Sequence, residues 1–144
     1  MRHTRGALKR FLRHQAGYRI ACVSILLLPS GLFAEVIRDG TIGPDHLIQP
    51  AGPHFQIPAE FGTQRGPNLF HSFTELSLSK DQSATFTGIS GIDNIIARVT
   101  GPNASTIDGP LRAKASADLY LLNPHGILFG PNAELDLQGA FYVS

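Results

Sequence analysis

The sequence has little of what stabilises most small secreted scaffolds. Its 144 residues include one cysteine, one methionine and no tryptophan, and only 16% of the side chains are charged. With a single cysteine no disulfide can form within the chain, so the class of disulfide-stabilised scaffolds is excluded. The length is sufficient for one domain and not for two.

Long helical patterns are also missing. The chain contains 15 glycines and 10 prolines, which interrupt helices and mark turns. From residue 35 onward we expect short strands joined by turns and no helix.

Basic side chains are concentrated at the N-terminus. Residues 1–34 contain six basic side chains and no acidic one, whereas residues 35–144 contain six basic and eleven acidic ones, a net charge of −5. A weakly acidic body with scattered basic residues lacks the electrostatic footprint of a nucleic-acid binder. We therefore exclude DNA and RNA as partners.

Residues 1–34 have the order of a secretory signal peptide. A basic region ends at Arg19, the apolar residues 20–28 follow, Pro29 breaks the segment and the small residue Ala34 precedes the expected cut. The apolar stretch is shorter than the roughly 20 residues that a membrane-spanning helix needs. No Arg-Arg pair precedes it, which favours the general secretory route into the periplasm. Cys22 would be lost with this segment.

The remainder reads as a series of short strands. The second half of 69–78 alternates apolar and polar residues with a period of two, as a strand with one buried face does. We expect strands at 36–37, 46–48, 55–57, 69–78, 84–87, 95–99, 105–111, 117–122, 127–129, 135–137 and 139–143.

A weak internal repeat points to the architecture. Gly-Pro-Asn-Ala occurs at 101–104 and again at 130–133, an offset of 29, and Gly-Pro-Asn at 66–68 is an unevenly spaced third copy. Short strands at one coil per 20–30 residues fit a β-solenoid. A β-sandwich has similar turn punctuation, and the spacing alone does not separate the two.

Four blocks in this order resemble a known family. They are Asn-Leu-Phe-His-Ser-Phe at 68–73, Ile-Ala-Arg-Val at 96–99, Ile-Asp-Gly-Pro-Leu-Arg at 107–112 and Asp-Leu-Tyr-Leu-Leu-Asn-Pro-His-Gly-Ile-Leu-Phe-Gly-Pro-Asn-Ala at 118–133. Together they resemble the filamentous-haemagglutinin-type secretion domain, the N-terminal domain of two-partner-secretion exoproteins. The resemblance extends through essentially the whole chain after residue 34.

The resemblance implies an all-β fold, a right-handed parallel β-helix, and a partner. The partner would be an outer-membrane β-barrel transporter whose periplasmic docking domains recognise the chain. The family signature Asn-Pro-Asn-Gly-Ile falls on Asn123, Pro124, His125, Gly126 and Ile127, with His125 in place of the second asparagine. This swap is mild, because histidine shares with asparagine an enrichment at positive φ. The implied location is the cell surface or the extracellular space.

Two departures from the family pattern stand out. A second family motif, Asn-Pro-Asn-Leu, is missing where residues 88–94 read Gly-Ile-Ser-Gly-Ile-Asp-Asn; the similar Pro-Asn-Leu at 67–69 lies elsewhere. Family domains normally continue for more coils before an adhesive or toxic passenger, so we expect residues 35–144 to be an incomplete N-terminal part. Contact with a host or neighbouring cell would then come from the passenger.

No catalytic site, metal site or cofactor is expected. His46, His54, His71 and His125 lack metal-ligand spacing. His71 reads as a hydrogen-bonded strand residue, and its neighbour Ser72 should point to the opposite face, which argues against a Ser–His pair. Asp93, Asp108, Asp118 and Asp136 lack a calcium-loop spacing and read as solvated turn acids. Asn94, Asn103, Asn123 and Asn132 read as turn residues.

The function expected from the resemblance is a secretion domain at the front of an adhesin or exotoxin. One alternative is a stand-alone β-helical adhesin that needs no transporter. A less favoured alternative is a secreted polysaccharide-degrading enzyme, which would need a cluster of charged side chains on one face of the solenoid.

Overall fold

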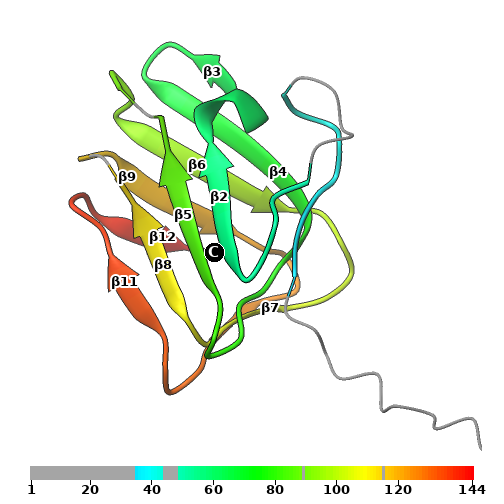
Figure 1. Ribbon diagram of the computed structural model, residues 1–144. Helices are drawn as coiled ribbons and strands as arrows, with labels where there is room; N and C mark the ends of the chain where they lie inside the picture. The colour runs from blue at the N-terminus through cyan, green and yellow to red at the C-terminus, as the bar shows by residue number, and fades with distance from the viewer. Residues whose placement is uncertain (1–34, 44–48, 89, 115) are drawn as a thin grey trace, which may run out of the picture.

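The protein winds as a coil of short strands (Figure 1). The computed structural model describes residues 35–43, 49–88, 90–114 and 116–144. The elements are β1 (Val36–Arg38), β2 (His54–Pro58), the 3₁₀ helix η1 (Ala59–Phe61), β3 (Thr63–Arg65), β4 (Asn68–Leu76), β5 (Ser83–Thr87), β6 (Asn94–Val99), β7 (Ser105–Ile107), β8 (Pro110–Ala113), β9 (Asp118–Leu122), β10 (Ile127–Phe129), β11 (Glu134–Asp136) and β12 (Phe141–Val143). The predicted signal peptide and the strand expected at 46–48 lie outside the described residues.

Three parallel sheets form the sides of a β-solenoid of about four turns. Sheet A contains β4, β6, β9 and β12, sheet B contains β2, β5, β8 and β11, and sheet C contains β7 and β10, extended by a bridge from Leu78 to Ile107. Each turn runs through sheet B, then sheet A, then sheet C. In Figure 1 the strands of sheet B lie side by side in front of those of sheet A. The expected solenoid is confirmed, and the β-sandwich alternative is wrong.

The Gly-Pro-Asn-Ala repeat does not mark the coils. Its first copy precedes β7 in sheet C, and its second copy precedes β11 in sheet B. Residues paired between neighbouring coils are 22 positions apart at one extreme (Ser105 with Ile127) and 29 at the other (His54 with Ser83). The structural equivalent of the turn at 101–104 is therefore the turn at 123–126, which has a different sequence.

The first coil carries two antiparallel strands that the sequence analysis did not separate from the parallel coil. β1 pairs with the end of β4, and β3 pairs with its beginning. Both lie along the edge of β4 opposite β6. They cover backbone groups that an open parallel edge would leave unpaired.

The core consists of inward side chains stacked in columns along the solenoid. Leu69, Ile95 and Leu119 form one column in sheet A, and each is no more than 1% exposed. In sheet B, Phe86 lies between Ile57 and Ala113, so a large side chain has a small neighbour on one side. Parallel in-register pairing imposes these columns, because equivalent residues of successive coils face the same side.

The last coil is the least covered part of the described chain. The exposed large hydrophobic side chains there are Leu128, Phe129, Leu135, Tyr142 and Val143, between 45% and 61% exposed, and all belong to β10, β11 and β12. Among the described residues, no helix is long and apolar enough to cross a bilayer.

One polar side chain lies inside the core without a hydrogen bond. His71 is 1% exposed, and neither ring nitrogen has a partner. Its ring lies 5.3 Å from the ring of Phe86 and 6.1 Å from that of Phe73. Burial, with the cation of Arg38 as a second cause, lowers the pKa of His71 to about 4. The expectation of a hydrogen-bonded His71 is wrong, because its side chain points into the apolar core, in the column that continues through Ala97 and Leu121.

His71 should make the fold sensitive to mild acid. Its pKa is 6.5 in an unfolded chain and about 4 in the fold, so between these values the unfolded chain binds a proton that the folded chain does not. The free energy of unfolding should fall by about 3 kcal/mol as the pH drops from 6.5 to 4. Urea unfolding of the full chain at pH 7.5 and 4.5 measures this loss.

The His71→Leu chain should lose that part of the pH dependence and be at least as stable at pH 7.5, because leucine leaves no unpaired ring nitrogen. His54→Gln, at an exposed position of β2, is the matched control and should keep the dependence. An unchanged pH dependence in His71→Leu would contradict the assignment.

Candidate functional site

The expected motif forms the turn between β9 and β10. Asn123 is 2% exposed, whereas Pro124, His125 and Gly126 are exposed and Ile127, half-buried, begins β10. Solvent therefore reaches the three middle residues of the motif, whereas Asn123, its first residue, is buried.

Asn123 is held by hydrogen bonds to the previous coil and to its own turn. Its Nδ2 donates to the carbonyl of Asn103 and to Oγ of Ser105, each at 3.0 Å. Its Oδ1 accepts from the backbone N–H of His125 at 2.9 Å. A side chain with a donor and an acceptor at this position is required to satisfy all three contacts, which explains an asparagine.

Backbone contacts complete the turn. Gly126 donates its N–H to the carbonyl of Asn123 at 2.9 Å, and its own carbonyl accepts from the N–H of Ser105 at 3.0 Å. Gly126 adopts φ 98°, a left-handed conformation in which a side chain would be strained. His125 contributes its backbone N–H to this set of contacts, and its side chain is exposed. This explains why histidine can stand where the family motif has asparagine.

Polar side chains link neighbouring coils elsewhere too, which the sequence analysis missed. Asn94 donates to Oδ1 of Asn68 at 2.8 Å across β6 and β4. Asp108 accepts from the backbone N–H of Asn132 at 2.8 Å, and Asp118 from the N–H of Ala140 at 2.8 Å. The turn acids Asp108 and Asp118 are thus bonded to the next coil and are more than solvated surface groups. The signal was present in the sequence: three strands begin Asn-Leu-Phe, Asn-Ile-Ile and Asp-Leu-Tyr at 68, 94 and 118.

A dense polar cluster joins the N-terminal segment to sheet A. Asp39 accepts hydrogen bonds from the hydroxyls of Ser72 at 2.5 Å, Thr41 at 2.8 Å and Thr100 at 2.8 Å. Arg98 donates to the Ser72 hydroxyl at 3.0 Å. Burial raises the pKa of Asp39, but the hydrogen bonds led by Ser72 outweigh this and hold the pKa below its ordinary value. These hydrogen bonds tie the segment after β1 to β4 and to the end of β6.

The Ser–His pair considered from the sequence is not formed. His71 points into the core, and Ser72 points to the outer face of sheet A, where it bonds to Asp39. The prediction that the two side chains face opposite ways is confirmed.

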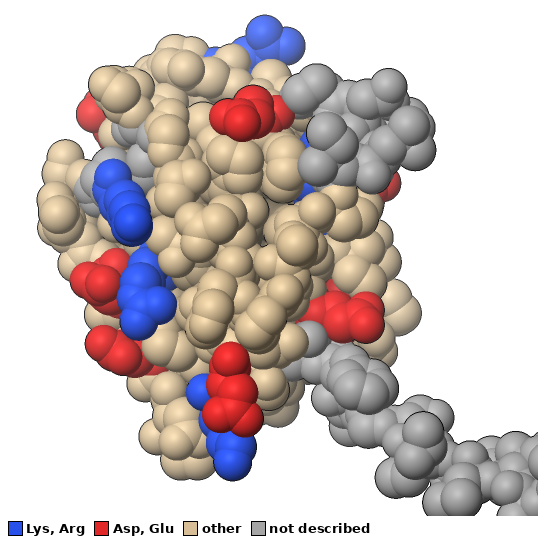
Figure 2. Space-filling model, in the orientation of Figure 1, with Lys and Arg blue, Asp and Glu red and all other residues tan. Residues whose placement is uncertain are grey.

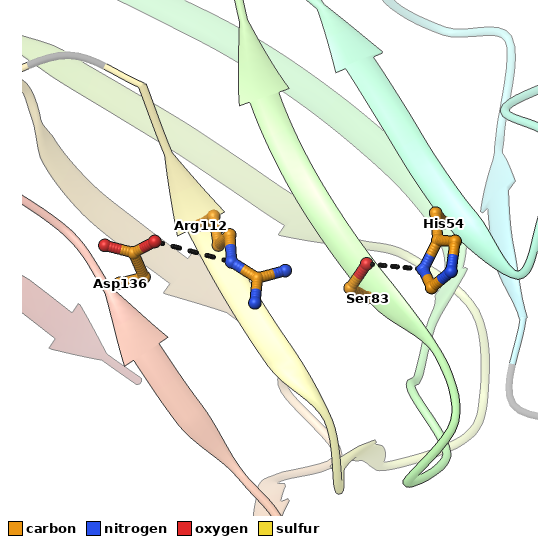
Figure 3. Close-up of polar contacts among 4 residues, drawn as sticks. All are labelled: His54, Ser83, Arg112 and Asp136. Atoms are coloured by element: carbon orange, nitrogen blue, oxygen red, sulfur yellow. Dashed lines mark hydrogen bonds and ion pairs between the residues drawn. The ribbon is translucent and has the colours of Figure 1, made fainter.

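The outer face of sheet B carries contacts between paired residues of neighbouring strands. Figure 3 shows His54 on β2 beside Ser83 on β5, with Nδ1 and Oγ 3.0 Å apart, and Arg112 on β8 beside Asp136 on β11, with Nε and Oδ2 3.4 Å apart. The ion pair is solvent-exposed and worth at most about 1 kcal/mol. Figure 2 shows the charges on this face as few and of mixed sign. In the described ranges no three His, Cys, Asp or Glu side chains are placed to hold a metal ion.

Comparison with known proteins assigns the chain to a family. A family model described as TPS secretion domain matches residues 34–144, which is most of the chain and includes the Asn123 turn. No curated protein and no solved structure matches the chain.

Replacing Asn123 should weaken the fold measurably. Asn123→Ala removes three hydrogen bonds and leaves the buried hydroxyl of Ser105 without its partner, so we expect a loss of about 2–3 kcal/mol in urea unfolding. Asn132→Ala is the matched control: this asparagine is exposed, and its loss should cost less than about 1 kcal/mol. Equal destabilisation by the two changes would show that Asn123 has no special structural role.

Proposed function

Because the chain belongs to the family of TPS secretion domains, we propose that it is the N-terminal secretion domain of a two-partner-secretion exoprotein of the adhesin or exotoxin type. A domain of this family acts with a cognate outer-membrane transporter and is exported across the outer membrane to the cell surface or beyond. The observation that carries the proposal is the family match over residues 34–144, together with a β-solenoid fold.

The proposed export path begins with a signal peptide at residues 1–34. The family match starts at residue 34, where the signal peptide would end, which supports the boundary. The chain would then enter the periplasm, and residues 35–144 would meet periplasmic docking domains of the transporter.

Residues 123–127 are the proposed recognition motif. In the folded domain the Asn123 side chain is buried and bonded to Asn103, Ser105 and His125, so a partner has no access to it. If the transporter reads Asn123, it reads the chain before this turn has folded. Addition of the extended motif as a strand to a periplasmic domain would allow such reading. Folding outside the cell would then bury Asn123 and discourage return.

The alternatives are less well supported. The family is one of secretion domains and not of enzymes. A polysaccharide-degrading enzyme would need the charged cluster discussed above, and the face of sheet B in Figure 2 carries scattered charges instead. A stand-alone adhesin differs from the proposed function in that it would be exported without the transporter, and an export assay can test this difference.

Recognition and folding can be separated in an export assay. Cells would produce the full chain with the cognate transporter, and the chain would be quantified in the culture supernatant. We expect Asn123→Ala to reduce export at least about tenfold, a change of about 1.4 kcal/mol in the recognition step.

The control is Leu121→Ala, which removes a buried side chain two residues before the motif and destabilises the fold by about 2–5 kcal/mol without altering the motif. It should be exported better than Asn123→Ala. Equal export losses would mean that folding alone limits export, and export without the transporter would favour the stand-alone adhesin.

A further inference from the structure

The outer face of sheet A carries an apolar column. Phe70, Ile96, Tyr120 and Tyr142 are paired in register on β4, β6, β9 and β12, and all four point away from the core. Strand positions that face water are normally polar, as Asn68, Asn94 and Asp118 are in the adjacent column. The core does not explain the four apolar side chains.

Ile96 interrupts what would otherwise be an aromatic stack. The rings of Tyr120 and Tyr142 stack at 4.5 Å with planes 12° apart, close to the spacing of neighbouring strands. Phe70 and Tyr120 are separated by two strand spacings, about 10 Å. A flat ring placed between them needs about 7–8 Å between the planes of the two flanking rings, so the spacing is sufficient for one ring. The structure has a hollow of about 270 Å³ at this place, lined by Asn68, Phe70, Asn94, Ile96 and Tyr120. We call it the Ile96 notch.

One end of the notch offers a neutral donor and acceptor. Asn94 uses Nδ2 to bond Oδ1 of Asn68, so Nδ2 of Asn68 and Oδ1 of Asn94 have no partner among the described residues. A hydroxyl group both donates and accepts, and it can therefore bond either atom. No charged side chain lines the notch, which disfavours an anionic or cationic ligand.

These features fit a flat-sided, uncharged ring with hydroxyl groups on its edge. We propose that the Ile96 notch binds one pyranose ring of a neutral glycan, sandwiched between Phe70 and Tyr120 and hydrogen-bonded by Asn68 and Asn94. The C–H face of the sugar meets the electron-rich face of each aromatic ring, and its hydroxyls meet the two amides. This site lies on sheet A, away from the turn at 123–127, and does not depend on the proposed export function.

The tyrosines of the chain can report sugar binding through their fluorescence. It has no tryptophan and three tyrosines, at 18, 120 and 142. In the full chain with Tyr18→Phe, tyrosine fluorescence reports only the apolar column. Titration with maltotriose, cellotriose or chitotriose should change this fluorescence saturably for at least one sugar, and saturation-transfer NMR should show contact at the C–H protons of one pyranose unit.

Ile96→Phe fills the notch with the missing ring and should weaken binding of that sugar at least tenfold. Leu122→Phe adds the same ring at another half-buried, outward position of sheet A and should leave binding unchanged. If Ile96→Phe fails to fold, Tyr120→Leu removes one wall and should weaken binding to a similar extent. The proposal is overturned if none of the three sugars binds or if neither notch variant weakens binding. Binding of p-cresol without binding of any sugar would also overturn it, and would indicate that the notch takes the aromatic side chain of a partner protein.

Discussion

Parallel coils stacked in register fix where each strand side chain of this solenoid lies. Successive strands lie about 4.8 Å apart, so every side chain rests on its equivalent in the next coil. Inside, this produces the column of Leu69, Ile95 and Leu119, in which each member excludes water from its neighbours. The same constraint places His71 among aromatic rings with no hydrogen-bond partner, and on the outer face it sets Phe70 and Tyr120 two strands apart across Ile96.

Stacking also creates a problem at the corners, where the chain turns between sheets and its backbone groups leave the ladder. The structure solves it with side-chain amides and carboxylates that bond the neighbouring coil, as Asn123, Asp108 and Asp118 do. Asn123 is the most deeply buried of these three, and it belongs to the proposed recognition motif. Under that proposal the two uses of Asn123 would be separated in time, because reading would require an extended chain and stacking requires a folded one.

Several elements differ from what the sequence suggested, for identifiable reasons. The Gly-Pro-Asn-Ala copies are alike because both are turns before a strand, yet they lie before different sheets. The strand at β3 and the antiparallel pairing of β1 escaped notice because three-residue strands leave almost no periodicity to read. The true repeat, at 68, 94 and 118, was concealed by offsets of 26 and 24 residues, since loops of different length separate equivalent strands.

Three features followed from the sequence: the strand content, the placement of His71 and Ser72 on opposite faces of their strand, and the location of the Asn123 motif in a turn. These are local properties, set by two or three neighbouring residues and by turn chemistry. Four features emerge only in the folded chain: the pairing of the strands, the Asn68–Asn94 hydrogen bond, the burial of Asn123 against Ser105, and the notch over Ile96. Each of these depends on the register between residues 18 to 26 positions apart, and loop lengths set that register without leaving a local pattern.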